Sequence, residues 1–439
     1  MRKGNLLAGL DARAALGQEM HDFAAELFPV CRSITGNGVR TTLDAISRHA
    51  PLQISEVPSG TRVLDWTVPD EWNVREAYIA DSSGRRIVDF AASNLHLVSY
   101  SVPVRARMSL AELMPHLHSL PDQPDLIPYR TSYYQRTWGF CMPETLRRSL
   151  REDTYEVVVD TTLAPGALTY GEHVKPGTDP HAGEVLLSAH VCHPSLANDN
   201  CSGLALLAML GRHLATRATR HTYRLLFAPG TIGAITWLAG HRDDVNRISH
   251  GLVVSNVGDA GGPTYKRSRR GDATIDRAAA HVLRFCKLPN ARVVEFSPYG
   301  YDERQYCSPG FDMPVGSLQR SQWGEFPQYH TSADNLDFIR PEHLAQSFRL
   351  VVSILDVLER DARYVNQAPY GEPQLGRRGL YGGAGDCPDF RMALLWVLNQ
   401  SDGRHALLDI AERAALPFAL IADAADALAG TDLLRRCED

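Results

Sequence analysis

The sequence lacks any long run of apolar residues. No stretch approaches the roughly 18 to 20 uninterrupted apolar residues that a membrane-spanning helix needs. Residues 1–20, MRKGNLLAGLDARAALGQEM, carry charges where a signal peptide requires an apolar core. We therefore expect a cytoplasmic protein that does not bind a membrane.

Paired cysteines and excess positive charge are also missing. The eight cysteines include no CxxC pair, so the sequence predicts neither a disulfide framework nor a cysteine-rich zinc knuckle. The 45 Lys and Arg residues are outnumbered by 51 Asp and Glu residues, which gives a net charge of −6. This balance argues against a general attraction for nucleic acid or anionic lipid. A small molecule or a peptide-like substrate fits it better.

What is present indicates an ordinary globular protein of several domains. Apolar residues make up 44% of the chain and charged residues 22%, a composition that folds compactly. A length of 439 residues exceeds what one hydrophobic core usually organises. We therefore expect two or three domains.

The pattern of short and long elements predicts where these domains lie. Short β-rich runs separated by Gly, Pro and Ser-Gly turns predict a β-rich insert at residues 51–165. From residue 166, apolar strands alternate with helices, which predicts a mainly parallel sheet covered on both faces. We expect residues 1–50 and 166–365 to form this discontinuous α/β domain. Residues 366–385, rich in Gly, Pro and Arg, are predicted to be a linker, and residues 386–439 a small helical domain.

Two segments carry residues that could bind a metal ion. In VLLSAHVCHPSLANDNCSG, His190 ends an apolar strand, and a polar loop with His193 and Asp199 follows. The second segment, EFPQYHTSADNLDFI, places His330 in a loop, with Asp334 among the polar groups that could orient an imidazole. Imidazole and carboxylate ligands suit zinc, and a catalytic site needs about three of them. Each histidine could instead be a hydrogen-bonded loop residue, and His193 could bind the metal instead of or beside His190.

These two segments resemble signatures of the zinc aminopeptidase and glutaminyl cyclase superfamily. AHVCHPSLANDNCSG is similar to its "AH, then GA-x-D-x-x-S-G" signature, and YHTSADN is similar to its closing "YHT-x-x-D" signature. The resemblance implies an α/β fold with a mixed, mainly parallel sheet flanked by helices. It also implies that His190, Asp199 and His330 are the metal ligands and that the Asp199–Asn200 peptide is a candidate cis bond.

Nearly the whole chain resembles a bacterial group of aminopeptidase-like proteins associated with polysaccharide biosynthesis. The matching stretches include CRSITGNGVR, DWTVPDEWN, LFAPGTIGAITWL, YDERQYCSPGFDMPVG and LLWVLNQSDGRHALLDIAE. In that group the β-rich insert sits on the peptidase-like domain, and the tail is a winged-helix-like module. Residues 386–439 hold five Arg, no Lys and ten Asp or Glu, a net charge of about −5. We therefore expect this module to make a protein contact, such as homo-oligomer assembly, and not to bind nucleic acid.

The chain departs from the superfamily where dizinc aminopeptidases carry further carboxylates. Gly230 and Thr231 stand in place of the Glu-Glu pair, and Cys192 and Ser255 replace two expected aspartates. The remaining two imidazoles and one carboxylate suit one zinc ion better than two, and the usual general base is absent. We expect a mononuclear zinc hydrolase of an amide or peptide-like bond. Two alternatives are a non-hydrolytic binding or scaffold protein that retains the fold, and a biosynthetic acyl-transfer enzyme that uses the same site.

A replacement base could come from the segment YDERQY, which corresponds to an active-site stretch of the superfamily. Glu303 is the preferred candidate and Asp302 the second, because a buried carboxylate beside a metal can take a proton from water. The competing interpretation is that both carboxylates pair with Arg304 or with the basic run KRSRR.

Four further residues are candidates for substrate binding. Lys266 and Arg267, in the run KRSRR, could bind a carboxylate or phosphate, although such a run is more often a solvated face. Arg130 and Tyr133 lie in an aromatic segment that could wall a pocket or fill a core.

Overall fold

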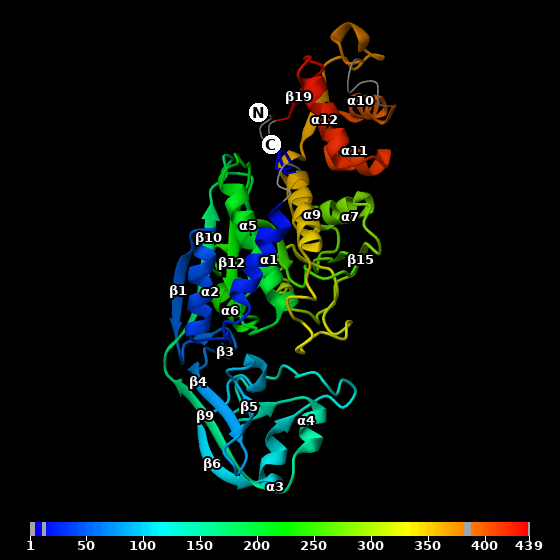
Figure 1. Ribbon diagram of the computed structural model, residues 1–439. Helices are drawn as coiled ribbons and strands as arrows, with labels where there is room; N and C mark the ends of the chain where they lie inside the picture. The colour runs from blue at the N-terminus through cyan, green and yellow to red at the C-terminus, as the bar shows by residue number, and fades with distance from the viewer. Residues whose placement is uncertain (1–4, 11–14, 382–387, 438–439) are drawn as a thin grey trace.

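The computed structural model describes residues 5–10, 15–381 and 388–437 and has three parts (Figure 1). An α/β domain lies in the middle, a β-rich domain at one end and a small helical domain at the other. Within the described ranges, no helix combines the length and the apolar character needed to cross a membrane.

The α/β domain is built on a mixed sheet. Its strands are β1 (Gln53–Pro58), β10 (Ala167–Lys175), β11 (Glu184–His190), β12 (Thr222–Ala228), β13 (Ile248–Val254), β14 (Thr264–Lys266), β15 (Arg292–Val294) and β16 (Val315–Gln319). Their order across the sheet is β1-β10-β12-β11-β13-β16-β14-β15. The central strands β12, β11, β13 and β16 are parallel, whereas β1 and β10 run antiparallel to their neighbours at one edge. The predicted mixed, mainly parallel sheet is confirmed.

Helices cover both faces of this sheet, as Figure 1 shows. They are α1 (Leu16–Leu27), α2 (Asn37–Ser47), α5 (Gly203–Ala215), α6 (Ile232–Gly240), α7 (Thr274–Phe285), α8 (Glu303–Tyr306) and α9 (Pro341–Arg360). Along β11, Val185 and Leu187 belong to the core beneath α1, α5 and α9, while Leu186 belongs to the core beneath α6. Successive side chains of a strand point to opposite faces, so an uninterrupted apolar run such as EVLLSAH is what a doubly covered strand requires.

The β-rich domain is an antiparallel sheet with short helices packed on it. Its main strands are β4 (Glu71–Ala80), β5 (Arg86–Asp89), β6 (Val104–Ser109) and β9 (Thr154–Ala164), in the order β5-β4-β9-β6. Smaller elements are β2 (Arg62–Val63), β3 (Trp66–Thr67), η1 (Asn94–His96), α3 (Leu110–Leu113), η2 (Met114–His116), β7 (Leu117–His118), β8 (Phe140–Cys141) and α4 (Glu144–Ser149). Only two residues separate β9 from β10 of the large sheet, so the two domains are joined here by a short connection between strands.

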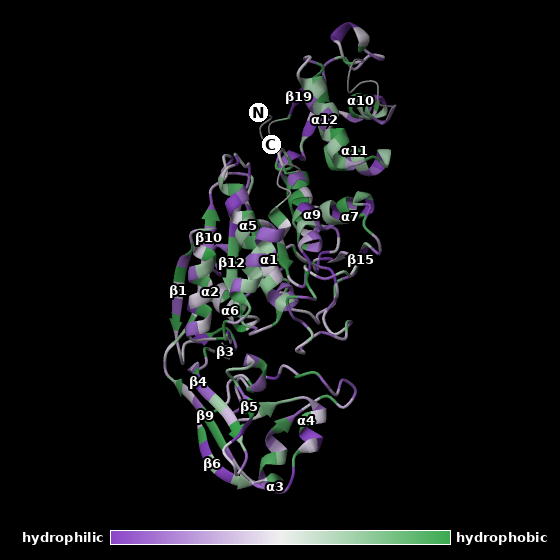
Figure 2. Ribbon diagram, viewed as in Figure 1, coloured by the Kyte–Doolittle hydropathy of each residue, from purple (hydrophilic) through white to green (hydrophobic). Residues whose placement is uncertain are grey.

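The small C-terminal domain combines a three-stranded sheet with helices. Its elements are β17 (Arg363–Asn366), η5 (Gly376–Arg378), α10 (Pro388–Gln400), β18 (Asp402–Ala406), α11 (Leu407–Ala414), α12 (Phe418–Ala429) and β19 (Leu434–Arg436). Helices α11 and α12 are largely hydrophobic (Figure 2), and their apolar residues form the core of the domain. Ion pairs from Arg277 of α7 to Asp409 and Glu412 attach this domain to the α/β domain.

Two domain boundaries differ from those predicted. The sequence places residues 53–58 in the insert, but they form β1 and pair with β10 at the edge of the large sheet. It places residues 363–365 in the α/β domain and residue 366 in the linker, but residues 363–366 form β17, the central strand of the C-terminal sheet, between β18 and β19. Both strands are short and partly exposed, and their partners are distant in sequence, so local patterns gave no sign of the pairing. Residues 382–385 of the predicted linker and residues 386 and 387 lie outside the described residues.

Candidate metal centre

A histidine and an aspartate meet where β11 ends. The imidazole of His190, the last residue of the strand, lies with its Nε2 atom 2.7 Å from Oδ1 of Asp199. Asp199 belongs to the turn Ala197–Ser202, which leads into α5, and both side chains are fully buried. The Asp199–Asn200 peptide is cis, as the sequence resemblance implies.

His330 reaches the same carboxylate from a distant loop. Its Nε2 atom lies 3.2 Å from the second oxygen, Oδ2, of Asp199. The carboxylate of Asp199 therefore lies between two imidazoles. The three residues predicted as ligands are brought together in the structure.

His193 lies beside this group. One ligand atom from each of His190, His193 and Asp199 lies within 4.8 Å of the others, and the rings of His193 and His330 are 5.2 Å apart. Burial holds the pKa of His193 well below its usual value and so favours the neutral imidazole, the form that binds metals. The structure thus keeps open the alternative that His193 is a ligand beside His190.

The charge of Asp199 is stabilised by its surroundings. Burial alone would raise the pKa of this carboxyl, but the nearby imidazoles of His193 and His190 and the hydrogen bonds from His190 and His330 together outweigh it and hold the pKa well below its usual value. Cys192 does not belong to this group of donor atoms: its Sγ accepts the backbone N–H of Gly230 at 3.3 Å and lies 3.2 Å from the Tyr301 hydroxyl, and burial raises the pKa of its thiol to about 12.

Asp334 fixes the loop that carries Asp199. Its carboxylate accepts hydrogen bonds from the backbone N–H groups of Asn198, at 2.6 Å, and Asp199, at 3.0 Å. The amide of Asn198 in turn donates to Asp259 at 2.8 Å. The motif YHTSADN therefore supplies His330 and also supports the Asp199 turn, whereas the sequence suggested that Asp334 would orient an imidazole.

Tyr301 occupies the space next to the position of the missing Glu-Glu pair. A Cβ atom on Gly230 would lie 2.1 Å from Cε1 of the Tyr301 ring, so the ring excludes any side chain there. The Tyr301 hydroxyl lies 3.2 Å from Sγ of Cys192 and 3.5 Å from Nδ1 of His193, and its ring centroid is 3.9 Å from that of His190. Sequence reasoning singled out YDERQY but weighed its carboxylates and not its first tyrosine.

Glu303 and Lys266 form a buried ion pair behind Tyr301. Oε1 of Glu303 lies 2.8 Å from Nζ of Lys266, and the Glu303 carboxylate also accepts the backbone N–H of Tyr301. The pairing agrees with the competing interpretation of the sequence, in which the Glu303 carboxylate pairs with the basic run KRSRR that begins at Lys266. Asp302 is also buried, and burial raises the pKa of its carboxyl well above the usual value.

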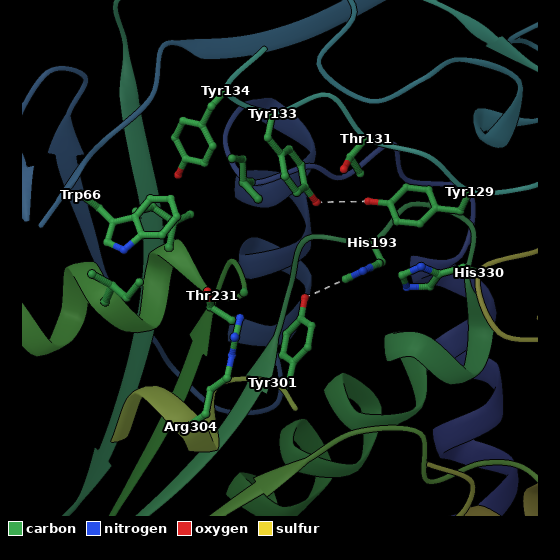
Figure 3. Close-up of a pocket in the computed structure, with 14 residues that line it drawn as sticks. Trp66, Tyr129, Thr131, Tyr133, Tyr134, His193, Thr231, Tyr301, Arg304 and His330 are labelled. Carbon is green, nitrogen blue, oxygen red and sulfur yellow. Dashed lines mark hydrogen bonds between the residues drawn. The ribbon is translucent and has the colours of Figure 1, made fainter. Parts of the chain in front are cut away.

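A cavity of about 350 Å³ opens next to the imidazoles (Figure 3). Of the four predicted substrate-binding residues, Tyr133 lines it, whereas Lys266, Arg267 and Arg130 do not. The insert supplies aromatic side chains to its wall, among them Trp66 of β3. The lining residues are Ile34, Trp66, Tyr129, Thr131, Tyr133, Tyr134, His193, Gly230, Thr231, Ile232, Ile235, Tyr301, Arg304 and His330.

Hydrogen bonds tie the insert to the loop that carries His330. The backbone N–H of Tyr129 donates to the carbonyl of His330 at 2.8 Å, and the N–H of Ser332 donates to the carbonyl of Ile127 at 2.9 Å. The centroids of the Tyr129 and His330 rings lie 5.1 Å apart in an edge-to-face arrangement. The insert therefore completes the cavity and also holds one predicted ligand.

Two family models and a relative of known sequence match this chain. The family model described as "Domain of unknown function (DUF4910)" matches residues 21–361, and the model described as "winged helix-turn-helix" matches residues 362–436. A protein of Clostridium acetobutylicum is 49% identical over 95% of this chain and 96% of its own length. It is named "Putative polysaccharide biosynthesis protein with aminopeptidase-like domain". The sequence resemblance to aminopeptidase-like proteins of this group is thereby confirmed.

Solved structures show the same fold. A crystal structure of a "putative peptidase" from Clostridium acetobutylicum matches with a TM-score of 0.93 and 46% identity, over 98% of both chains. A zinc aminopeptidase from Bacillus subtilis matches with a TM-score of 0.57 and 12% identity, over 77% of this chain and 94% of its own. A peptidase M28 precursor from Shewanella amazonensis matches with a TM-score of 0.55 and 14% identity, over 81% and 95%. The last two likenesses establish an aminopeptidase-like fold.

Proposed function

The chain belongs to the family described as "Domain of unknown function (DUF4910)", with a winged-helix domain after it, and we propose that it is a zinc-dependent hydrolase of an amide or peptide-like bond. The observation that carries this proposal is the carboxylate of Asp199, which lies between His190 and His330 next to a cavity. A hydrolase needs such a site open to substrate, and His330 and His193 line that cavity.

The donor set fits one zinc ion. His190, Asp199 and His330 would hold it, with His193 as the alternative ligand, and all four offer nitrogen or oxygen atoms of the kind zinc prefers. The ionised Asp199 is fully buried, and a buried negative charge is stable only when a cation or hydrogen-bond donors compensate it. When bound, a zinc ion would polarise a substrate carbonyl and lower the pKa of water towards neutrality.

Tyr301 is the residue best placed to act on the substrate. Burial raises the pKa of its phenol well above the usual value, so the hydroxyl keeps its proton and remains a hydrogen-bond donor. It lines the cavity beside His193. We assign it to donate a hydrogen bond to the oxygen of the scissile carbonyl as negative charge develops there.

Glu303 acts as a positioning residue in this scheme. Sequence analysis favoured it as the general base, but its carboxylate oxygens are engaged by Lys266 and by the backbone of Tyr301. It is also absent from the lining of the cavity, as is Asp302. Its contact with the Tyr301 backbone lets it hold that ring against Gly230.

Metal analysis together with an amidase and aminopeptidase screen tests this proposal. We expect about one zinc per chain in the purified protein, and loss of both zinc and hydrolysis in Asp199→Asn and His330→Ala. His405→Ala, a substitution at a half-buried histidine of β18 in the C-terminal domain, is the control and should keep both. A protein that holds no metal, or whose activity survives Asp199→Asn, would contradict the proposal.

Acyl transfer in a biosynthetic pathway is the second candidate. It is favoured by the name of the Clostridium relative, which refers to polysaccharide biosynthesis, and by the absence of a carboxylate from the described lining of the cavity. A hydrolase needs a base to activate water, whereas an amine that enters in its neutral form is the stronger nucleophile and passes its proton to the leaving group or to water. Product analysis with and without an added amine separates the two: a new amide formed only with the amine would favour transfer.

A further inference from the structure

One cationic side chain lines the cavity, and it was not among the predicted binding residues. Arg304 lies on the short helix α8 and is exposed. Within the described part of the chain it forms no ion pair within 4.0 Å and no hydrogen bond through its guanidinium. Figure 3 shows its side chain reaching towards Thr231, with Trp66 and Tyr134 on one side of the cavity and His193 on the other.

The described lining offers this cation no negative partner. Its other polar members are imidazoles, hydroxyls and an indole, and it contains no aspartate or glutamate. The sequence neighbour Asp302 is buried and does not line the cavity, and burial raises the pKa of its carboxyl well above the usual value, even though the charge of Arg304 opposes this shift. A guanidinium is always charged, and its N–H groups match two oxygens of a carboxylate or phosphate. Such a group on the substrate could therefore accept the hydrogen bonds of Arg304 that the described lining does not accept.

The side of the cavity away from His193 presents flat aromatic surfaces (Figure 3). Trp66 is 47% exposed and Tyr134 is 50% exposed, and their ring centroids lie 5.5 Å apart. Two open rings side by side form a surface on which a ring of a ligand can pack. Both come from the insert, so the same segment that completes the cavity supplies a surface against which a ring can pack.

We propose that the cavity selects an anionic amide, in which a carboxylate or phosphate of the substrate binds Arg304 and a ring packs on Trp66 and Tyr134. The inference rests on the proposed function for the position of the scissile bond, which lies at the His193 end. It has a consequence for specificity: the described lining holds no acidic side chain that could bind the free ammonium group of a peptide N-terminus. We therefore expect an anionic substrate whose amine is blocked to bind more tightly than one whose amine is free.

Three probes that share a benzamide group test the role of charge by calorimetric titration. Hippurate carries a carboxylate, N-benzoylaminomethylphosphonate carries a phosphonate, and N-benzoylglycinamide is neutral. We expect at least one anionic probe to bind the purified protein about 10-fold more tightly than the neutral probe, the gain typical of a hydrogen-bonded ion pair. Which of the two binds more tightly distinguishes a carboxylate substrate from a phosphate substrate.

Substitutions locate the effect. Arg304→Gln should remove the preference for the anionic probes, and Arg304→Lys should keep part of it. Arg242→Gln, at an exposed arginine in the turn after α6, is the matched control and should behave as the wild type. Equal binding of charged and neutral probes, a preference that survives Arg304→Gln, or no binding of any probe at millimolar concentration would overturn the inference.

Repeating the titrations after chelation separates this inference from the proposed function. Binding at Arg304 does not need a metal, so the preference should persist in chelated protein even if no hydrolysis is ever found. A preference that disappears on chelation while Arg304→Gln has no effect would place the anion at the imidazoles and overturn the role of Arg304.

Discussion

At the scale of single residues, Gly230 and Tyr301 explain how this chain differs from enzymes with a Glu-Glu pair. The ring of Tyr301 lies where a side chain at position 230 would begin. Glycine is therefore required by a close approach of a neighbouring ring. The Tyr301 ring and a carboxylate side chain at position 230 could not occupy this part of the cavity wall together.

Gly230→Ala should consequently displace Tyr301. The added methyl group would lie 2.1 Å from Cε1 of the ring, and overpacking of this kind costs about 1 to 3 kcal/mol of stability. We expect a lower melting temperature and loss of activity together, measured by calorimetry and by the amidase screen. Gly240→Ala is the control, since nothing lies within 4 Å of its added methyl. Unchanged activity in Gly230→Ala would show that Tyr301 is not needed where it lies.

His250 gives the protein a pH-dependent stability. Burial, with the neighbouring charges of His221 and Arg220, lowers the pKa of this imidazole to about 3. The unfolded chain binds its proton near pH 6.5 and the folded chain does not, so stability is lost as pH falls from about 6.5 towards 3. The loss from this residue is at most about 1.4 kcal/mol per pH unit.

Urea unfolding at several pH values checks this prediction. His250→Gln should reduce the decline of unfolding free energy between neutral and acidic pH, while His181→Gln, at an exposed position, should leave it as in the wild type. An identical decline in His250→Gln would mean that other groups are responsible.

At the scale of elements, the turn after β11 depends on a loop far along the chain. The Asp334 carboxylate accepts hydrogen bonds from the backbone N–H groups of Asn198 and Asp199, so it fixes the position of the turn that carries the Asp199 carboxylate. The cavity wall likewise depends on the insert, whose backbone is bonded to the loop that carries His330. The turn that carries Asp199 is thus held by the loop of Asp334, and the loop that carries His330 is held by the insert.

Asp334→Asn should therefore weaken metal binding without unfolding the protein. An amide oxygen can accept one of the two hydrogen bonds but its NH₂ group cannot accept the other, and such supporting changes typically cost 10- to 100-fold in metal affinity. Zinc affinity would be measured by competition with a chromophoric chelator. Asp337→Asn, three residues on and exposed, is the control. Equal zinc affinity in the two variants would contradict the role of Asp334.

At the scale of the whole molecule, the winged-helix domain is attached to the α/β domain by ion pairs as well as by a shared apolar core. Arg277 pairs with Asp409 and Glu412, and Arg360 pairs with Asp423 and Asp426 of α12. Helix α12, the second helix of the helix-turn-helix, contains no Lys or Arg. A DNA-binding domain of this class places that helix in the major groove and relies on basic side chains.

We accordingly expect no DNA binding by the intact protein. A mobility-shift assay with duplex DNA at low salt, where phosphate contacts are strongest, should show no retained complex. Retention that weakens steeply as salt is raised would contradict this expectation. The predicted homo-oligomer stays a prediction, and light scattering during size-exclusion chromatography would decide it.

The sequence by itself determined the fold class and the parts of the candidate site that lie in contiguous motifs. The apolar run ending at His190 predicted a strand covered on both faces, and the signatures around it identified Asp199 and His330. These features are local, because strand burial and the spacing of residues in a motif are written in adjacent positions.

Only the tertiary structure decided what depends on contacts between distant segments. It placed β1 and β17 in their sheets, engaged Glu303 with Lys266, and set Tyr301 against Gly230. It also brought Arg304 and the aromatic residues of the insert to one cavity. Strand pairing, ion pairing and side-chain packing bring together residues that are far apart along the chain. A pattern of neighbouring residues therefore cannot show which of these contacts form.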